Sequence, residues 1–197
     1  LYIKQNFRKI WTIFIDVKNV FFPNTKPSLH FDENNVCLAC KYTDYYEKEI
    51  DWDQKLENFY ELCKDIKKNR TSDYDCIIPV SGGKDSTYQT HLIAKIGELK
   101  PLLVSFEPSY PTEVGKYNLN NLPSKFNCDL LQLKKSKETY KKLAKIGFDV
   151  VGDHEWPNHV GIFAWPVQIA FTHNIKVLFY GESQGLIGLG RWDKLVS

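Results

Sequence analysis

The feature that most restricts the fold of this chain is a regular alternation of short apolar runs and helical patterns in its second half. Near-continuous apolar runs predict four buried strands, at residues 76–80, 102–106, 130–133 and 176–180. Helical patterns lie between or before them, at residues 85–97, 113–126, 136–146 and 159–173. Strands that are buried on both faces and separated by helices form a parallel sheet with helices on both faces. Right-handed crossovers between the strands then give a doubly wound sheet. We therefore predict an α/β fold with a doubly wound parallel sheet.

The first part of the chain has a different pattern. Residues 50–68 place apolar side chains at helical spacing, with lysines and acids on the other face, which predicts an amphipathic helix. The polar residues 69–73 follow and break the pattern. We therefore expect an N-terminal extension of helix and loops over residues 1–70 and the α/β domain over residues 71–197.

The composition excludes several classes of protein. Twenty-six basic residues against 24 acidic ones leave a net charge of +2, too balanced to favour nucleic acid or an anionic membrane as a partner. The longest early apolar stretch, residues 10–17, is broken by Thr12 and Asp16 and is far below the roughly 20 residues of a membrane span. No secretion signal precedes it, so we expect a cytosolic chain.

The ends of the chain suggest a piece of a longer protein. The chain begins with Leu1, has no methionine and stops at Ser197, shortly after the last predicted strand and a glycine-rich segment. We expect an internal fragment whose α/β domain is incomplete at its C-terminus; the alternative is a natural short protein with a trimmed start.

A glycine-rich loop stands where the first predicted strand meets the first helix. Residues 81–86 read Ser-Gly-Gly-Lys-Asp-Ser, at the carboxyl end of a strand, where open α/β sheets bind ligands. Two glycines let the backbone turn tightly, and the following helix adds N–H donors and its dipole, so the loop suits an anion. Lys84 adds a positive charge, whereas Asp85 would repel phosphate unless Mg²⁺ lay between them.

The combination is more specific than the alternative, a glycine turn with a serine cap. It differs from the Walker loop, which needs four residues between its glycines before Lys and Ser or Thr. It resembles the PP-loop of the ATP pyrophosphatase superfamily. The resemblance implies that the loop holds pyrophosphate while AMP passes to a substrate oxygen.

Further segments resemble the N-acetyl sugar amidotransferases, over about residues 17 to 182. The N-terminal matches are Asn-Thr-Lys-Pro at 24–27, Phe-Asp-Glu-Asn at 31–34, Cys-Leu-Ala-Cys at 37–40 and Ile-Asp-Trp at 50–52. The strand and loop at 74–86 match next, including the strand proline. Later matches are Gly115, Asn118, Leu119, and the segments 159–163, 166–170 and 181–182.

This resemblance implies an enzyme that acts on precursors of bacterial surface polysaccharide, such as lipopolysaccharide, and of flagellar glycan. It would use ATP and Mg²⁺ to adenylate the acetamido oxygen of a nucleotide-linked N-acetyl sugar, and ammonia would then give an acetamidino group. Lys84 and Asp85 are the candidate catalytic residues, and Asp85 is the candidate magnesium ligand. The candidate nucleotide-binding residues are Ser81, Gly82, Gly83, Lys84, Asp85, Ser86, Ser105, Phe106, Gly181 and Glu182.

Some of these roles have alternatives. The resemblance implies that Ser105 and Phe106 hold adenine by backbone contacts, and that Glu182 positions magnesium or substrate; Glu182 also fits a solvated loop. His154 and His159, near Asp153 and Glu155, are candidates for contacting the sugar or assisting proton removal from ammonia. The alternative for this cluster is a solvated loop with a helix-capping histidine. No glutaminase part is visible, so the resemblance implies a separate glutaminase subunit as ammonia source.

The cysteines give a weaker signal. Cys37 and Cys40 form a Cys-x-x-Cys, one half of a zinc knuckle, but the positions where the family has its other pair hold Val17 and Val20. Valine cannot bind a metal, and two thiolates make a poor zinc site, so the sequence does not favour zinc; a redox role stays open. The other three cysteines, Cys63, Cys76 and Cys128, are predicted to be packing residues.

Two other functions stay open. A PP-loop tRNA-modifying enzyme, such as a thiolase, would also adenylate a carbonyl oxygen, but it would be expected to carry a strongly basic surface. A non-catalytic nucleotide-binding remnant would keep the fold without turnover. The apparent truncation favours the remnant, and the intact loop at residues 81–86 opposes it.

Overall fold

The computed structural model describes residues 31–108 and 110–181. These residues divide into two compact units, with the boundary between Asp53 and Gln54. Glu182, Val17 and Val20 lie outside the described residues. The units are described separately below.

The first unit holds a tight turn and a helix, α2 (Leu38–Lys48). The carboxylate of Asp32 accepts hydrogen bonds from the N–H groups of Asn34 and Val36, each 2.9 Å, and so closes the turn. Lys41 lies 2.9 Å from Asp32, and this hydrogen bond is the main reason that the pKa of Asp32 lies below its usual value. Helix α2 was not predicted, because the segment after the Cys-x-x-Cys shows no clear apolar stripe.

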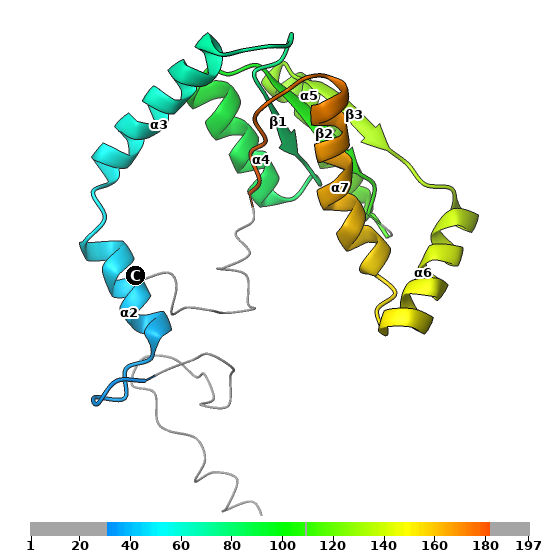
Figure 1. The fold of residues 1–197 in the computed structure, drawn as a ribbon, viewed down its shortest axis with the longest axis horizontal. Helices are drawn as coiled ribbons and strands as arrows, with labels where there is room; N and C mark the ends of the chain where they lie inside the picture. The colour runs from blue at the N-terminus through cyan, green and yellow to red at the C-terminus, as the bar shows by residue number, and fades with distance from the viewer. Residues whose placement is uncertain (1–30, 109, 182–197) are drawn as a thin grey trace, which may run out of the picture. The chain divides into compact units, whose positions relative to one another are not determined.

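The second unit is built around a parallel sheet (Figure 1). Its strands are β1 (Cys76–Pro79), β2 (Pro101–Phe106) and β3 (Asp129–Leu133), in the order β1-β2-β3. Three of the four predicted strands and the α/β class are therefore confirmed. The fourth, at residues 176–180, is reduced to one parallel bridge, in which Leu178 pairs with Ile77 on the free side of β1. Its hydrogen bonds, from Ile77 N–H to Val177 and from Phe179 N–H to Ile77, are both 2.9 Å.

Helices occupy the places predicted for them, before and between the strands. They are α3 (Trp52–Lys68), α4 (Lys84–His91) with a π-helical turn η1 (Leu92–Ile96), α5 (Glu113–Phe126), α6 (Lys137–Val151) and α7 (Trp156–Thr172). Helix α6 runs beyond its predicted end at Ile146 and includes Gly147, where a Cβ atom would lie 2.7 Å from the carbonyl oxygen of Asp153. It stops at Gly152, which has a positive φ of 74°.

The sheet is covered on both faces. Ile78 and Leu103 point into a core shared with α3, η1 and α5. Ile77, Leu102 and Val104 point to the opposite face, where they pack against Ile169 and Ala170 of α7. This alternation follows from the two-residue period of a strand. The predicted doubly wound arrangement is confirmed, with α3, α4 and α5 on one face and α7 on the other.

Helix α3 belongs structurally with the sheet, although the sequence grouped it with the N-terminal extension. Its buried residues Cys63 and Ile66 complete the core on the α5 side. Cys76 is buried in the same core and Cys128 packs against it, so the prediction that these three cysteines are packing residues is confirmed. Burial raises the pKa of each of these thiols.

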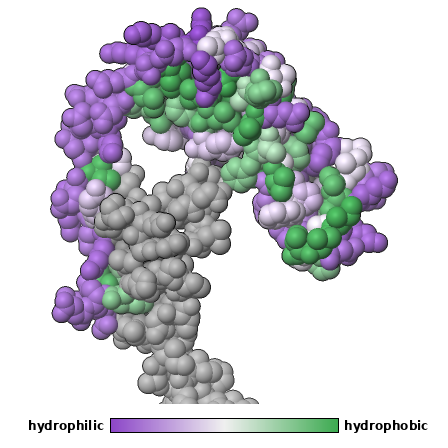
Figure 2. All heavy atoms as spheres, viewed as in Figure 1, coloured by the Kyte–Doolittle hydropathy of each residue, from purple (hydrophilic) through white to green (hydrophobic). Residues whose placement is uncertain are grey.

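Apolar side chains also reach the surface of this unit. Figure 2 shows them gathered near the C-terminal end of α6, where Ile146, Phe148 and Val150 are exposed. On α7, Val167 and Phe171 are exposed while the opposite side of the helix is buried. Even so, none of the helices in residues 31–108 and 110–181 is both long and apolar enough to cross a membrane.

Candidate nucleotide-binding site

The predicted phosphate loop occupies the crevice where the direction of the sheet winding reverses. β1 is flanked by β2 on one side and by the Leu178 bridge on the other. The helix after β1 and the helix before the bridge lie on opposite faces of the sheet. Residues 81–83 leave the carboxyl end of β1 at this point and lead into α4. Open α/β sheets bind their ligands at such a position.

The turn of the loop depends on Gly82 and on the helix behind it. Gly82 has a φ of 81°, which L side chains rarely adopt. A Cβ atom there would also lie 2.5 Å from the carbonyl oxygen of Gly115 and 2.9 Å from the amide nitrogen of Leu119. Both belong to α5, so this helix supports the loop from behind. Gly83 has an ordinary extended conformation and caps α4.

The loop hydroxyls close the loop on itself. The N–H of Ser81 donates to Oγ of Ser86 and the N–H of Gly83 donates to Oγ of Ser81, both at 3.4 Å. Ser86 donates to the carbonyl oxygen of Gly83 at 3.2 Å. Bonds of 3.4 Å are long and weak for N–H donors. A phosphate oxygen could therefore replace them at little cost.

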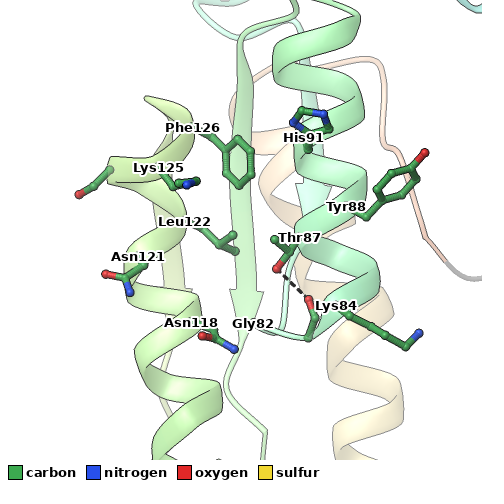
Figure 3. Close-up of a pocket in the computed structure, with 12 residues that line it drawn as sticks. Gly82, Lys84, Thr87, Tyr88, His91, Asn118, Asn121, Leu122, Lys125 and Phe126 are labelled. Atoms are coloured by element: carbon green, nitrogen blue, oxygen red, sulfur yellow. Dashed lines mark hydrogen bonds between the residues drawn. The ribbon is translucent and has the colours of Figure 1, made fainter.

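Lys84 and Asp85 form an ion pair with 2.6 Å between Nζ and Oδ1. Their side chains are 88% and 75% exposed, so the pair contributes little to stability and both side chains are free to reorient toward a ligand. Figure 3 shows Lys84 projecting from α4 away from α5. Mg²⁺ is commonly bound by one or two carboxylates together with phosphate oxygens. The role of Asp85 as a magnesium ligand stays a prediction.

One cavity of about 720 Å³ opens at the carboxyl edge of the sheet. Its walls combine the loop residues 81–83 with residues after β2 and with residues at the end of β3, chiefly Glu107, Tyr110, Thr112, Gly115, Gln132 and Lys134. A volume of this size is within the range for small-molecule and cofactor sites. Because the cavity touches the loop and three strand ends, it is the best candidate for the nucleotide.

A second cavity of about 920 Å³ is a groove between α4 and α5 (Figure 3). Leu122 and Phe126 lie at its floor, and its rim carries Thr87, His91, Asn118 and Lys125. The groove shares Gly82, Gly83 and Asn118 with the first cavity. Lys84 lines the groove and not the carboxyl-edge cavity, so it would have to turn to reach a phosphate held by the loop.

The two predicted adenine-binding residues, Ser105 and Phe106, point to opposite faces of the sheet. Ser105 is fully buried on the α5 side of β2, and its Oγ has no hydrogen-bond partner among the described residues. Phe106 points to the opposite face, where its ring fills the space left by Gly161 of α7. Neither side chain lines the carboxyl-edge cavity, so their contact with adenine through the backbone stays a prediction.

Lys135, which follows β3, contacts the carboxyl end of β2. Its Nζ lies 3.7 Å from the centre of the Phe106 ring and donates to the carbonyl oxygen of Glu107 at 2.7 Å. Burial lowers the pKa of Lys135, and the nearby Glu107 and Glu155 oppose this shift. These contacts fix the segment after β2, which forms one wall of the cavity.

Gly181 lies at the other wall of the crevice. A Cβ atom on it would meet Oε1 of Gln89 at 3.0 Å, so α4 and the segment after the Leu178 bridge touch here. Gln89 Nε2 donates to the carbonyl oxygen of Phe179 at 2.8 Å. Sequence reasoning missed Gln89, because its helix position alone gives no sign of a partner 90 residues away.

The predicted substrate histidines lie at the start of α7. His154 Nε2 is 3.6 Å from Glu155, and His159 Nδ1 is 3.5 Å from Asp153. Both histidines are more than half exposed, and neither lines the two cavities at the loop. The carboxylate of Glu155 accepts from Tyr140 at 2.9 Å and from Asn158 at 2.6 Å, so it holds α6 to α7. Contact of the histidines with a sugar stays a prediction.

Cys37 and Cys40 are buried, with 3.5 Å between their Sγ atoms. Burial, followed by the neighbouring Cys37, raises the pKa of Cys40 to about 11. A structural zinc ion needs four ligands. In the part of the chain that the structure describes, no group of three or more His, Cys, Asp or Glu side chains could hold a metal, so a zinc knuckle does not fit the residues present.

Comparisons with known proteins bear on the fold. No protein-family model matches the chain. An uncharacterized protein of Methanocaldococcus jannaschii is 29% identical over 113 residues, which make up 55% of this chain and 38% of that protein.

Two solved structures are similar to this chain. The NMN synthetase of Francisella tularensis has a TM-score of 0.51 and 13% identity, with 65% of this chain and 53% of that chain covered. The NH3-dependent NAD synthetase of Campylobacter jejuni, solved with nitrate ion, has a TM-score of 0.49 and 14% identity, with 65% and 56% covered. The chain thus spans about half of each solved structure, and it shares the α/β fold of the NMN synthetase.

Proposed function

We propose that the chain is the nucleotide-binding part of an ATP-dependent, AMP-forming N-acetyl sugar amidotransferase. The observation that carries the proposal is the Ser-Gly-Gly-Lys-Asp-Ser loop, which lies at the reversal point of a doubly wound sheet and is held in its turn by α5. The similarity to a synthetase structure supports the fold on which this depends.

The reaction follows from the chemistry of an amide. Its carbonyl is a poor electrophile, and ammonia alone does not displace its oxygen. Attack of this oxygen on the α-phosphate of ATP would give an O-adenylyl imidate and release pyrophosphate. Ammonia would then attack the activated carbon, AMP would leave, and an amidine would remain.

The residues of the loop match the charge that develops in the first step. The departing pyrophosphate gains negative charge, which the loop N–H groups and the N-terminus of α4 would stabilise. Lys84 would add its charge after leaving Asp85, and Mg²⁺ held by Asp85 and the phosphates would neutralise the rest. The nucleotide itself would lie in the carboxyl-edge cavity, with its phosphates against residues 81–83.

The remaining parts of the proposal come from the sequence resemblance. The acceptor would be a nucleotide-linked N-acetyl sugar for surface polysaccharide, and a separate glutaminase subunit would supply ammonia. The natural, full-length protein is the right material for a test, because the chain spans only part of its relatives.

The experiment would incubate the full-length protein with Mg-ATP, ammonium and a panel of nucleotide-linked N-acetyl sugars. AMP and the sugar product would be followed by mass spectrometry, and NH in place of the acetamido oxygen would identify the amidine. We expect Lys84→Ala to reduce turnover by about a hundredfold, the size of effect seen when one transition-state donor is removed. Lys95→Ala, which removes an exposed lysine of η1 away from the loop, is the matched control.

Each outcome would decide between the open functions. AMP without a change in any sugar would redirect the search to other acceptors, with tRNA first. ATP binding without AMP formation on any acceptor would contradict the proposal and leave a nucleotide-binding remnant.

A further inference from the structure

The Cys37–Cys40 pair belongs to the first unit and has no role in the proposed reaction. Both side chains are buried, at 0% and 8% exposure, in a small cluster with Phe31 and Val36. Their sulfur atoms are 3.5 Å apart. Since the described residues offer no further metal ligands here, the pair needs another explanation.

The backbone places the two sulfurs on the same side of a helix start. Cys37 is the residue that precedes α2, and Cys40 lies in its first turn. A disulfide has a sulfur–sulfur distance of about 2.05 Å, so the two sulfurs would have to approach each other by about 1.5 Å to form the bond. Helix N-termini are also among the places where reactive cysteines and redox-active Cys-x-x-Cys pairs are found.

We propose that Cys37 and Cys40 form a reversible dithiol–disulfide site that reacts with low-molecular-weight disulfides. The proposal is independent of the proposed nucleotide chemistry. It rests on the sulfur–sulfur contact, on the position of the pair at the start of α2 and on the lack of fit to zinc.

The exchange is balanced without any other reagent. Cys40, the more exposed of the two, attacks one sulfur of the small disulfide as a thiolate and forms a mixed disulfide, releasing one small thiol. Cys37 then attacks the Cys40 sulfur and releases the second thiol. Two electrons pass to the small disulfide, and the two protons of the cysteines end on the two released thiols.

Closure would change the local structure in a defined way. The new bond would link the residue before α2 to its first turn, next to the Asp32 turn that precedes the helix. Oxidation would therefore stiffen the start of α2. The buried surroundings would also make the reaction slower than that of an exposed pair, because the attacking thiolate forms reluctantly there.

The test uses the intact, folded chain and reduced and oxidised glutathione in varied ratios. After equilibration, free thiols are blocked with iodoacetamide, and tryptic peptides are analysed by mass spectrometry. Cleavage should give peptide 19–41, which carries Cys37 and Cys40 and no other cysteine, since Lys26 precedes a proline. We expect this peptide to become two hydrogens lighter and unalkylated as the ratio becomes more oxidising.

The chain supplies its own internal controls. Cys63, Cys76 and Cys128 fall on three separate peptides, residues 56–64, 71–84 and 126–134. Cys37→Ser is the matched variant, and it should leave Cys40 as a free thiol or a glutathione adduct. In the unaltered chain, alkylation of both Cys37 and Cys40 at every ratio would overturn the proposal.

A measurement of zinc completes the test. One zinc ion per purified chain, with peptide 19–41 becoming alkylated only after chelation, would replace the redox site with a metal site. Zinc-free protein that still gives the disulfide peptide is the result expected.

Discussion

Two glycine turns of the second unit share a backbone conformation and differ in everything around them. Gly82 in the phosphate loop has a φ of 81°, and Gly152 between α6 and α7 has a φ of 74°. A Cβ atom on Gly82 would collide with the backbone of α5, whereas nothing lies within 4 Å of a Cβ atom on Gly152. At Gly82 a neighbouring helix therefore closes off the Cβ position, whereas at Gly152 this position is open.

The difference bears on the proposed role of the loop at residues 81–86. A turn between two helices needs only to reverse the chain, and its backbone conformation does that. A loop that presents N–H groups to an anion has to stay in one place. Contact with Gly115 and Leu119 of α5 supplies this restraint, so the loop geometry depends on a helix that follows the next strand.

The largest effect is expected from Gly82→Ala. An L residue in the left-handed conformation costs about 1–2 kcal/mol, and the collision with α5 adds overpacking of about 1–3 kcal/mol. The free energy of unfolding should fall by the sum, about 2–5 kcal/mol, measured by urea unfolding followed through tryptophan fluorescence. A decrease no larger than that of Gly152→Ala would show that α5 does not restrain the loop.

Gly161→Ala should have the next largest effect. Its Cβ atom would lie 2.2 Å from Cζ of Phe106, but a ring can shift more easily than a backbone. We expect a loss of about 1–3 kcal/mol in the same unfolding experiment. Phe106→Leu in the same chain should recover part of it, and additive losses in the double variant would show that the two residues do not compete for this space.

Gly152→Ala tests the turn between α6 and α7, in which the Cβ position of the glycine is open. Only the backbone penalty applies, so we expect a loss of about 1 kcal/mol in the free energy of unfolding. Gly152→Asn should lose less, because asparagine tolerates this conformation better than alanine. Equal losses for Ala and Asn would mean that the loss does not come from the left-handed backbone conformation of this residue.

The smallest effect on stability is expected from Gly83→Ala, where φ is −79° and the nearest side-chain atom to a Cβ is 3.4 Å away. The free energy of unfolding should change by less than about 0.5 kcal/mol. The added methyl group would face the proposed phosphate position, so the Kd for Mg-ATP should rise about tenfold, equivalent to 1.4 kcal/mol. The affinity would be measured by calorimetry on the full-length protein. An unchanged Kd would show that the phosphates do not lie next to Gly83.

Much of the fold follows from local sequence patterns. Apolar runs such as residues 102–106 identified the strands because a strand buried on both faces has no polar alternation. Gly82 and Gly83 marked the loop, and the tight turn requires a glycine at position 82, where φ is positive. The predicted strand at residues 176–180 was too long, since an apolar run does not reveal how many of its residues pair with a neighbouring strand.

The contacts between distant segments could not be predicted in the same way. The carbonyl oxygen of Gly115 behind Gly82, and the bond from Gln89 to Phe179, join residues whose own sequence neighbourhoods look ordinary. The burial of Ser105 follows from its side of the strand, which the short apolar run leaves ambiguous. The sulfur contact of Cys37 with Cys40 depends on α2, which the pattern did not indicate.

The pairing of Ile77 with Leu178 has a consequence for how the protein forms. The loop at residues 81–86 and helix α5 are synthesised before the segment at Leu178, which follows the end of α5 by about 50 residues. Closing such a long segment costs entropy before its contacts repay it, so this pairing is expected to be the slow step of folding. Until then the edge of β1 is an unpaired strand, with which another chain could pair.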